Sequence, residues 1–224
     1  MRAGSGDDDG RALSVDGGIA VLDYGIGNLA SAHKALVHLG ARARLVSDPA
    51  GAAGAAGVVL PGVGAFGRCA AALRDTGLEA VVHDALDRGT PFLGICIGFQ
   101  LLYESSEESP GVRGLGILPG PVRALPPGVK RPQMQWNQLV ARPGVTSELL
   151  AGVPDRAWVY FVHSYAPEHS DDVVATCDYG GEVVAAVERG PLWGTQFHPE
   201  KSGELGLGIL ANFVAACRAG LGAG

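Results

Sequence analysis

The chain has 224 residues, of which 47% are hydrophobic and 18% are charged, and its formal net charge is −6. A chain of this length can bury a core large enough for stability on its own, and we expect no cofactor and no metal. The net negative charge argues against a nucleic-acid partner, and the absence of a signal peptide and of a long apolar segment argues against a membrane and predicts a cytoplasmic protein.

Residues 1–17 are small, acidic and without hydrophobic periodicity, so we expect a disordered leader there and a single domain over residues 18–219. In the first half of that domain, apolar runs predict strands that alternate with helices. The strands fall at residues 19–22, 42–46, 58–60 and 91–95, and the helices at about 29–39 and 66–88, with a break near Thr76 and Gly77. This order predicts an α/β fold, an open and mostly parallel sheet with helices on both faces.

The second half changes character after Gly111, where short apolar runs alternate with Pro and Gly turns. These runs predict an antiparallel or mixed extension of the sheet, then a strand at residues 192–197 and a closing helix at about 205–217. The shorter strands are expected at residues 115–118, 122–124, 137–140, 158–161, 173–177 and 183–187.

Gly25 and Gly27 follow the first strand in a Gly-x-Gly pattern, which occurs in dinucleotide-binding loops. The third glycine of that pattern is missing, and no acidic residue closes the second strand convincingly. A turn that joins the strand to the helix is therefore the favoured interpretation.

Residues 94–100 join a buried strand to a helix through a tight turn at Cys96. Gly94 and Gly98 leave room for a sharp bend, so that Cys96 lies at its apex with an exposed thiol. The N-terminus of the following helix lowers a thiol pKa and offers N–H groups to an oxyanion. Taken alone, a cysteine among Ile and Phe is more often a core residue, and the residues downstream reverse that preference. None of the four cysteines forms a C-x-x-C pair, so neither a zinc site nor a disulfide framework is indicated.

Gly62 and Gly64 flank Val63 at the end of the third predicted strand. Two glycines let the intervening peptide planes turn, and such a segment can aim an N–H group at a reacting carbonyl. The alternative is a simple turn, as most Pro-Gly pairs are. Val63 and Cys96 both lie at C-terminal strand ends, where ligands gather in open parallel sheets.

His198 and Glu200 flank Pro199 at the end of the last predicted strand. Proline restricts the residue before it to an extended conformation, which fixes the position of the imidazole. In an extended chain Glu200 points to the same side as His198, so its carboxylate can bond one ring nitrogen and leave the other as a base. A lone His-Pro-Glu is more often a turn, but with a thiol at an elbow these residues complete a Cys-His-Glu triad.

Residues 94–100 and 195–200 resemble segments of the class I (triad) glutamine amidotransferase family. Within that family, further segments resemble the glutaminase subunits of imidazole glycerol phosphate synthase. These segments are residues 23–28, 61–66, 160–165 and 198–202. The resemblance extends from about Ile19 to Cys217 and implies the flavodoxin-like fold of the family.

The resemblance implies that Cys96 attacks the side-chain amide of L-glutamine, that His198 carries the thiol proton to the departing ammonia, and that Glu200 orients His198. The N–H groups of Ile97 and, after a peptide rotation, of Val63 would hold the oxyanion. The other positions that match substrate-binding residues of the family are Gly62, Gly64, Gln100, Glu108, His163 and Ser164. A zwitterionic ligand needs a carboxylate for its ammonium, and Glu108 can supply one, although its acidic surroundings alone indicate a solvated turn.

The resemblance also implies a protein partner, because ammonia that escapes into water becomes ammonium. That partner is a (β/α)8 cyclase subunit, which forms a heterodimer with the glutaminase and uses the ammonia to make imidazole glycerol phosphate and aminoimidazole carboxamide ribotide in histidine biosynthesis. The positions that match residues facing this partner are Asn28, Trp136, Tyr160 and Lys201. Trp136 is equally consistent with a core residue.

Two positions depart from the family pattern. Gln133 stands where histidine is common, and Gln135 adds a side chain where glycine is usual, so we expect changes at the interface and not in the triad. Two other interpretations are a subunit of a different synthase and a catalytically silent binding module. Residues 160–165, Lys201 and Ser202 argue against the first, and the intact triad argues against the second.

Overall fold

A computed structural model describes residues 17–27 and 29–221 of the chain. The leader expected over residues 1–17 lies outside the described residues except for Gly17, and so does the partner contact expected at Asn28.

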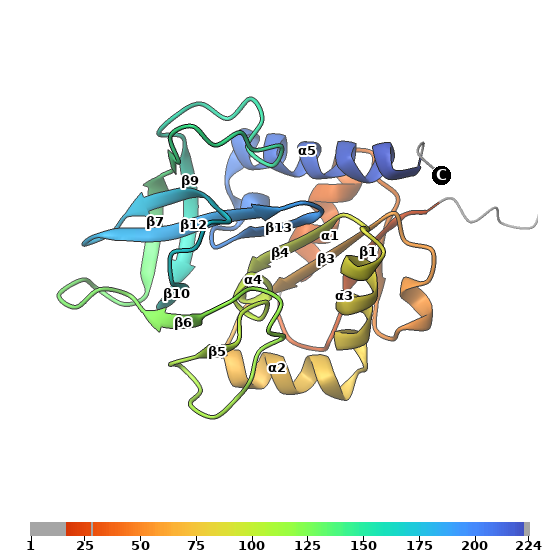
Figure 1. Ribbon diagram of the computed structural model, residues 1–224. Coiled ribbons are helices and arrows are strands. Elements are labelled where there is room, and N and C mark those ends of the chain that lie inside the picture. The colour runs from red at the N-terminus through yellow and green to blue at the C-terminus, as the bar shows by residue number, and fades with distance from the viewer. Residues whose placement is uncertain (1–16, 28, 222–224) are drawn as a thin grey trace, which may run out of the picture.

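A mixed sheet of eight strands forms the centre of the molecule (Figure 1). Its strand order is β2-β1-β3-β4-β13-β12-β11-β8. The parallel part consists of β1 (Ile19–Leu22), β2 (Ala43–Val46), β3 (Gly57–Gly62), β4 (Phe92–Cys96) and β13 (Leu192–Thr195). The antiparallel extension consists of β12 (Glu182–Arg189), β11 (Val173–Asp178) and β8 (Val140–Ala141). The predicted open, mostly parallel α/β sheet is confirmed.

Helices cover both faces of this sheet, as predicted (Figure 1). On one face α1 (Leu29–His38) packs beside α5 (Gly203–Leu221), and on the other lie α2 (Phe66–Asp75) and α3 (Leu78–Asp87), while the short 3-10 turn η1 spans Ala50–Ala52. Every residue of β1, β3, β4 and β13 is buried, because these strands are covered on both faces. The break between α2 and α3 falls at Gly77, whose φ of 73° favours glycine.

Two smaller sheets lie at the end of the molecule away from the last turn of α5 (Figure 1). In one, β7 (Gln133–Gln138) pairs antiparallel with β9 (Trp158–His163). The other contains β10 (Tyr165–Pro167), β6 (Pro121–Ala124) and β5 (Ser105–Ser106). Both sheets stand beyond the C-terminal ends of β4 and β13, and so enclose the sheet edge where the predicted site lies.

The sequence prediction needs two corrections next to this edge. The predicted helix behind Cys96 is present but is a single turn, α4 (Ile97–Gln100), so the expected contribution of a helix dipole is small. The strand expected at residues 115–118 is absent, because its N–H groups bond the carbonyls that follow α4 instead. Leu115 donates to Leu101 and Ile117 to Leu102, each at 2.8 Å.

Candidate active site

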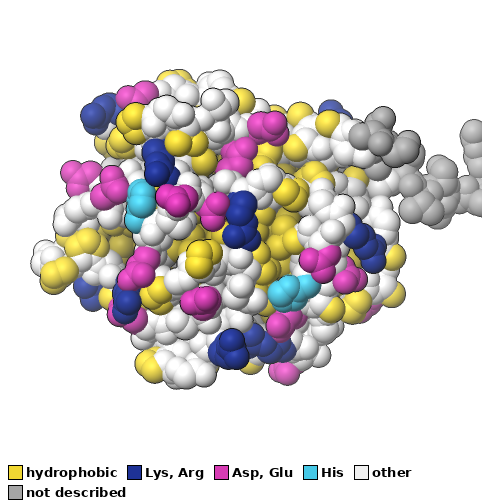
Figure 2. All heavy atoms as spheres, viewed as in Figure 1, with side chains coloured by type: hydrophobic (Ala, Val, Ile, Leu, Met, Phe, Trp, Pro, Cys, Tyr) yellow, Lys and Arg dark blue, Asp and Glu magenta, His cyan; other side chains and the backbone are white. Residues whose placement is uncertain are grey.

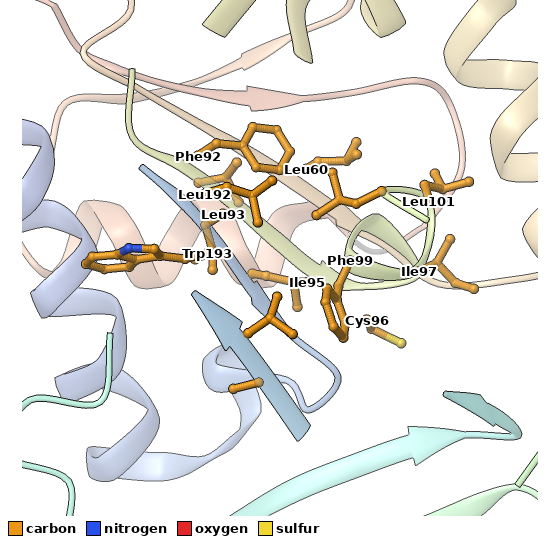
Figure 3. Close-up of a cluster of buried hydrophobic side chains, with 14 of the residues drawn as sticks. Leu60, Phe92, Leu93, Ile95, Cys96, Ile97, Phe99, Leu101, Leu192 and Trp193 are labelled. Carbon is orange, nitrogen blue, oxygen red and sulfur yellow. The ribbon is translucent and has the colours of Figure 1, made fainter. Parts of the chain in front are cut away.

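Cys96 ends β4 with φ 53° and ψ −109°, a conformation that residues other than glycine seldom adopt. The flanking glycines make room for it: a Cβ at Gly98 would overlap the Leu60 carbonyl oxygen, and one at Gly94 would lie 2.9 Å from the Gly98 carbonyl oxygen. A cluster of buried apolar side chains surrounds β4 and fixes the turn. Figure 3 shows the sulfur of Cys96 at the edge of this cluster, pointing away from it. Cys96 is nevertheless only 3% exposed, so the expectation of an exposed thiol is wrong.

The sheet register brings two other segments beside Cys96. Gly62 of β3 pairs with Cys96 itself, so Val63 follows at the same sheet edge. Thr195 of β13 pairs with Ile95, so the chain that continues to His198 emerges at that edge as well. Three segments that are distant in sequence thus meet at the C-terminal ends of adjacent parallel strands, where open α/β sheets bind their ligands.

His198 and Glu200 are joined through Nδ1 and Oε1, which lie 2.8 Å apart, and both side chains are buried. His198 is extended, with φ −100° and ψ 97°, as expected before proline. Glu200, however, belongs to a 3-10 turn, η2 (Pro199–Lys201), and not to an extended strand. The expected contact is therefore present, but the expectation that side-chain alternation along a strand produces it is wrong.

The environment of His198 stabilises its protonated form. Burial on its own lowers the pKa of His198, but the adjacent Cys96 sulfur and Glu200 carboxylate raise it to about 9. Because Nδ1 faces Glu200, Nε2 is the ring nitrogen left for the thiol. An imidazole in this setting can take a proton from Cys96 and hold it.

Gln196 is a buried residue of this site that was not predicted from the sequence. Its Nε2 donates to Cys96 Sγ at 3.8 Å, and its Oε1 accepts a hydrogen bond from Gln100 Nε2 at 2.9 Å. Gln196 therefore links the thiol to a predicted substrate-binding residue. Its place two residues before His198, within the motif at residues 195–200, was the available signal.

A cavity of about 360 Å³ opens beside Cys96, a volume that suits a small ligand. The predicted substrate-binding residues that line it are Val63, Gly64, Ile97, Gln100, Glu108, His163 and Ser164. Gly62 is not among them, because it is buried against the Tyr24 hydroxyl, which a Cβ at Gly62 would overlap. Lys201, predicted to face the partner, also lines the cavity, as do Pro132, Val162 and Tyr165.

Several polar side chains in the cavity wall use one atom for a hydrogen bond within the protein and leave a second atom available to a ligand. Gln100 Nε2 donates to the Tyr165 carbonyl at 2.8 Å, and within the described residues its buried Oε1 has no partner. Glu108 lies in a turn and is half-buried, and its Oε2 accepts from the Phe66 N–H at 2.7 Å, which orients the carboxylate. His163 Nδ1 lies 2.8 Å from the same Tyr165 carbonyl, and Nε2 is left over.

The other residues predicted to contact a partner lie on the β7–β9 ribbon. Trp136 and Tyr160 pair in its register, with ring centroids 6.1 Å apart. Trp136 is 46% exposed, so its interpretation as a core residue is wrong. Met134 and Trp158 are exposed on the same face, because alternate residues of a strand share a face. We call these four residues the aromatic face.

The two departures from the family pattern occupy the opposite face of the ribbon. Gln133 is fully buried and its Nε2 donates to Cys177 Sγ at 3.9 Å, whereas Gln135 is exposed. Neither side chain therefore interrupts the aromatic face.

Charges of both signs are interspersed over the side of the molecule seen in Figure 2. Within residues 17–27 and 29–221, no group of three or more His, Cys, Asp and Glu is placed to hold a metal ion. None of the helices described is long and apolar enough to cross a membrane.

Residues 20–217 match the family model of glutamine amidotransferase class-I, and the chain belongs to that family. Among individual proteins, it is similar to imidazole glycerol phosphate synthase subunit HisH of several organisms. It is 51% identical to the subunit of Methanothermobacter thermautotrophicus, over 90% of this chain and 100% of the relative. It is 51% identical to that of a Synechococcus species, over 88% and 92%. For Moorella thermoacetica the identity is 48%, over 87% and 93%.

Solved structures show the same fold at low sequence identity. One, described as a glutamine amidotransferase, has a TM-score of 0.71 at 21% identity, over 90% of this chain and 100% of the other. PurLQS from Thermotoga maritima gives a TM-score of 0.71 at 21% identity, over 88% and 97%. The predicted class I amidotransferase fold is therefore confirmed.

Proposed function

We propose that this chain hydrolyses L-glutamine as the glutaminase subunit of imidazole glycerol phosphate synthase. The observation that carries the proposal is the joined pair of His198 and Glu200, 2.8 Å apart, beside a strained Cys96 on the neighbouring strand end. The similarity to HisH subunits at 48–51% identity supports the choice of synthase.

In the proposed reaction, the Cys96 sulfur attacks the carboxamide carbon of glutamine while the thiol proton passes to Nε2 of His198. The tetrahedral intermediate collapses to a thioester when His198 gives that proton to the departing ammonia. Water, deprotonated by His198, then attacks the thioester and releases glutamate, and the proton returns to the thiolate. Glu200 holds the imidazole in place and stabilises its positive charge.

The oxyanion of the intermediate would lie between the N–H groups of Ile97 and Val63. Ile97 follows Cys96 directly, and Val63 follows the residue that pairs with Cys96. Gly62, the residue before this peptide, has no Cβ to oppose the backbone change when the Val63 N–H turns. One oxyanion donor contributes about 2.7–4 kcal/mol to transition-state stabilisation, or ~10²–10³ in rate. Turning the Val63 N–H towards the oxyanion therefore raises the rate enough to activate the enzyme.

The cavity offers acceptors for the ammonium of the substrate. Gln100 contributes a buried Oε1, and Glu108 contributes a carboxylate oriented by Phe66. An ammonium that meets both makes charge-assisted hydrogen bonds and satisfies an otherwise unpaired oxygen. Gly64, His163 and Ser164 complete the wall around the same end of the substrate.

The proposed partner is a (β/α)8 cyclase subunit that receives the ammonia and forms a heterodimer with this chain. The names of the relatives describe subunits, which supports an assembly. The aromatic face is the contact that we assign to it, with Lys201 beside the cavity. A cytoplasmic location is part of the proposal, because the four cysteines are free thiols, as is typical of a reducing compartment.

The test measures glutamine hydrolysis by the isolated chain, by its mixture with a cyclase subunit, and by the complex with the acceptor nucleotide. That nucleotide is the phosphoribulosyl-formimino aminoimidazole carboxamide ribotide. We expect the last rate to exceed the first by about 10²–10³, with formation of imidazole glycerol phosphate. Equal rates in all three would contradict the proposed activation by the Val63 rotation. No hydrolysis in any of them would overturn the proposed function. The cyclase supplied with ammonium salt is the control for the acceptor reaction.

A further inference from the structure

We propose that Tyr24 and Cys69 are positioning residues that clamp the backbone on both sides of the peptide carrying the Val63 N–H, and so confine the oxyanion-forming rotation to that one peptide. The inference rests on the proposed glutaminase function. It adds two side chains that belong to neither the triad nor the cavity wall.

The two side chains bond carbonyls that flank the rotating peptide. The Tyr24 hydroxyl donates to the Pro61 carbonyl at 3.0 Å, and the Cys69 thiol donates to the Val63 carbonyl with an S–O distance of 3.8 Å. The first carbonyl belongs to the peptide between Pro61 and Gly62, and the second to the peptide between Val63 and Gly64. The peptide between Gly62 and Val63 lies between the two points of attachment.

The clamp is part of the core. Tyr24 is 2% exposed and Cys69 is 0% exposed, and they approach the loop from different elements, the turn after β1 and the first turn of α2. The Tyr24 hydroxyl lies directly against Gly62, so that a Cβ there would overlap it. Gly27 adds further space, since a Cβ on it would lie 3.3 Å from the Val63 nitrogen. Buried groups in such contact are held in place by close packing.

Both donors keep their protons at neutral pH. Burial, with a smaller effect of the neighbouring Cys69, raises the pKa of Tyr24 well above its ordinary value. Burial likewise raises the pKa of Cys69 to about 11. A protonated thiol is a poor nucleophile but still a hydrogen-bond donor, so Cys69 suits a structural role beside the loop.

The clamp limits the rotation to two backbone torsion angles. When one peptide plane turns between fixed neighbours, ψ of the residue before it and φ of the residue after it change in opposite senses. Those residues are Gly62 and Val63, and Gly62 lacks the Cβ that would oppose the new ψ. The clamp therefore lets the N–H swing without moving Pro61 or Gly64, and returns it to the same position in every turnover.

The experiment compares Tyr24→Phe and Cys69→Ala with two matched controls in the complex with cyclase and acceptor nucleotide. Tyr103→Phe removes a buried hydroxyl that has no hydrogen-bond partner within the described residues. Cys217→Ala removes a buried thiol from α5. For each clamp variant we expect kcat for glutamine hydrolysis to fall about tenfold with KM within about twofold, because only oxyanion stabilisation is weakened. Both controls should stay within about twofold of the parent in both constants.

A second measurement uses the aldehyde analogue of glutamine. The Cys96 thiolate adds to its aldehyde carbon, a C–S bond forms, and the carbonyl π electrons become an oxyanion that is then protonated. Affinity for the aldehyde should fall by the same factor as kcat. Affinity for glutamine, measured with each clamp variant combined with Cys96→Ala so that no oxyanion forms, should not change. If Cys69→Ala destabilises the chain more than Cys217→Ala does, Cys69→Ser, which keeps a donor, decides: restored kcat supports the clamp, and kcat as low as in Cys69→Ala contradicts it.

The outcomes separate the clamp from the function on which it rests. An active parent complex whose clamp variants match their controls overturns the clamp alone. A parent complex that hydrolyses no glutamine overturns the proposed function and the clamp with it.

Discussion

The backbone N–H of His198 donates to the carbonyl oxygen of Tyr160 at 3.0 Å, which ties the proposed catalytic base to the strand that carries the aromatic face. Ser202 doubles this link, because its Oγ donates to the His198 carbonyl at 2.7 Å and accepts from the Tyr160 N–H at 3.0 Å. The Tyr160 ring in turn contacts Trp136. A partner bound to the aromatic face therefore has a short, hydrogen-bonded connection to the base.

Ser202→Ala removes this double link and should lower both stability and partner stimulation. It leaves the Tyr160 N–H without its partner and removes one of the two hydrogen bonds to the His198 carbonyl, which also accepts from the Lys201 N–H. The expected cost is about 1–3 kcal/mol in the free energy of unfolding. Ser170→Ala is the matched control, because the Ser170 hydroxyl has no hydrogen-bond partner in the described part of the chain. Urea denaturation measures the cost, and equal stability of the two variants would contradict the prediction.

Cys96→Ser or Cys96→Ala should abolish glutamine-dependent synthesis by the complex while ammonia-dependent synthesis survives. A glutamine-analogue electrophile should label Cys96 alone, because burial raises the pKa of Cys69 to about 11 and the pKa values of Cys177 and Cys217 to about 12. Thiols with such values contain little of the reactive thiolate at neutral pH. Peptide mapping of the labelled chain gives the position, and a label on any other cysteine would remove Cys96 as the nucleophile.

His198→Ala should cost glutamine hydrolysis on the order of 10²–10⁴, and Glu200→Ala should cost less, because Glu200 acts only through His198. Glu200→Gln tests the electrostatics. Cys96 and Glu200 raise the pKa of His198 to about 9 against the effect of burial, so removing the carboxylate charge lowers it. The imidazolium that protonates ammonia is then lost at lower pH, and the descending limb of the kcat/KM profile should move to lower pH. A limb that stays in place contradicts this role of Glu200.

The sequence predicted those parts of the site that depend only on residues adjacent in the chain. Glycine and proline act on their immediate neighbours, so the turn at Cys96 and the extended His198 were accessible from the sequence. Contacts between distant residues were not: Tyr24 and Pro61 are 37 residues apart, and Tyr160 and Ser202 are 42 apart. The prediction of a strand at residues 115–118 was wrong for the same reason, since hydrogen bonds to the turn after α4 override the apolar pattern of these residues.

The buried imidazole of His163 should make the fold sensitive to acid. Burial lowers its pKa from an ordinary 6.5 to about 4, so the folded chain binds fewer protons than the unfolded chain between these values. Stability is therefore present above about pH 6.5 and is lost as pH falls toward 4, by on the order of 3 kcal/mol from this residue.

His163→Asn removes the titration but keeps a donor for the Tyr165 carbonyl. The difference in unfolding free energy between about pH 7 and pH 4.5 should shrink by roughly 2–3 kcal/mol in this variant. His38→Asn, on the exposed end of α1, is the control and should leave that difference unchanged. An identical pH dependence in the His163 variant and the parent would show that this imidazole does not resist protonation.

Trp136→Ala tests the aromatic face as the docking surface for the cyclase. Trp136 stacks edge-on against Tyr160, the residue of this face whose carbonyl accepts from the His198 N–H. Large aromatic residues at the centre of an interface commonly contribute 2 kcal/mol or more, so we expect the dissociation constant of the complex to rise about 30-fold. Val145→Ala removes another exposed apolar side chain, outside the ribbon, and should leave the constant within about twofold. Titration calorimetry measures both variants. Because the loss is in affinity, a higher cyclase concentration should recover most of the stimulated hydrolysis, and an unchanged dissociation constant for Trp136→Ala would place the cyclase elsewhere.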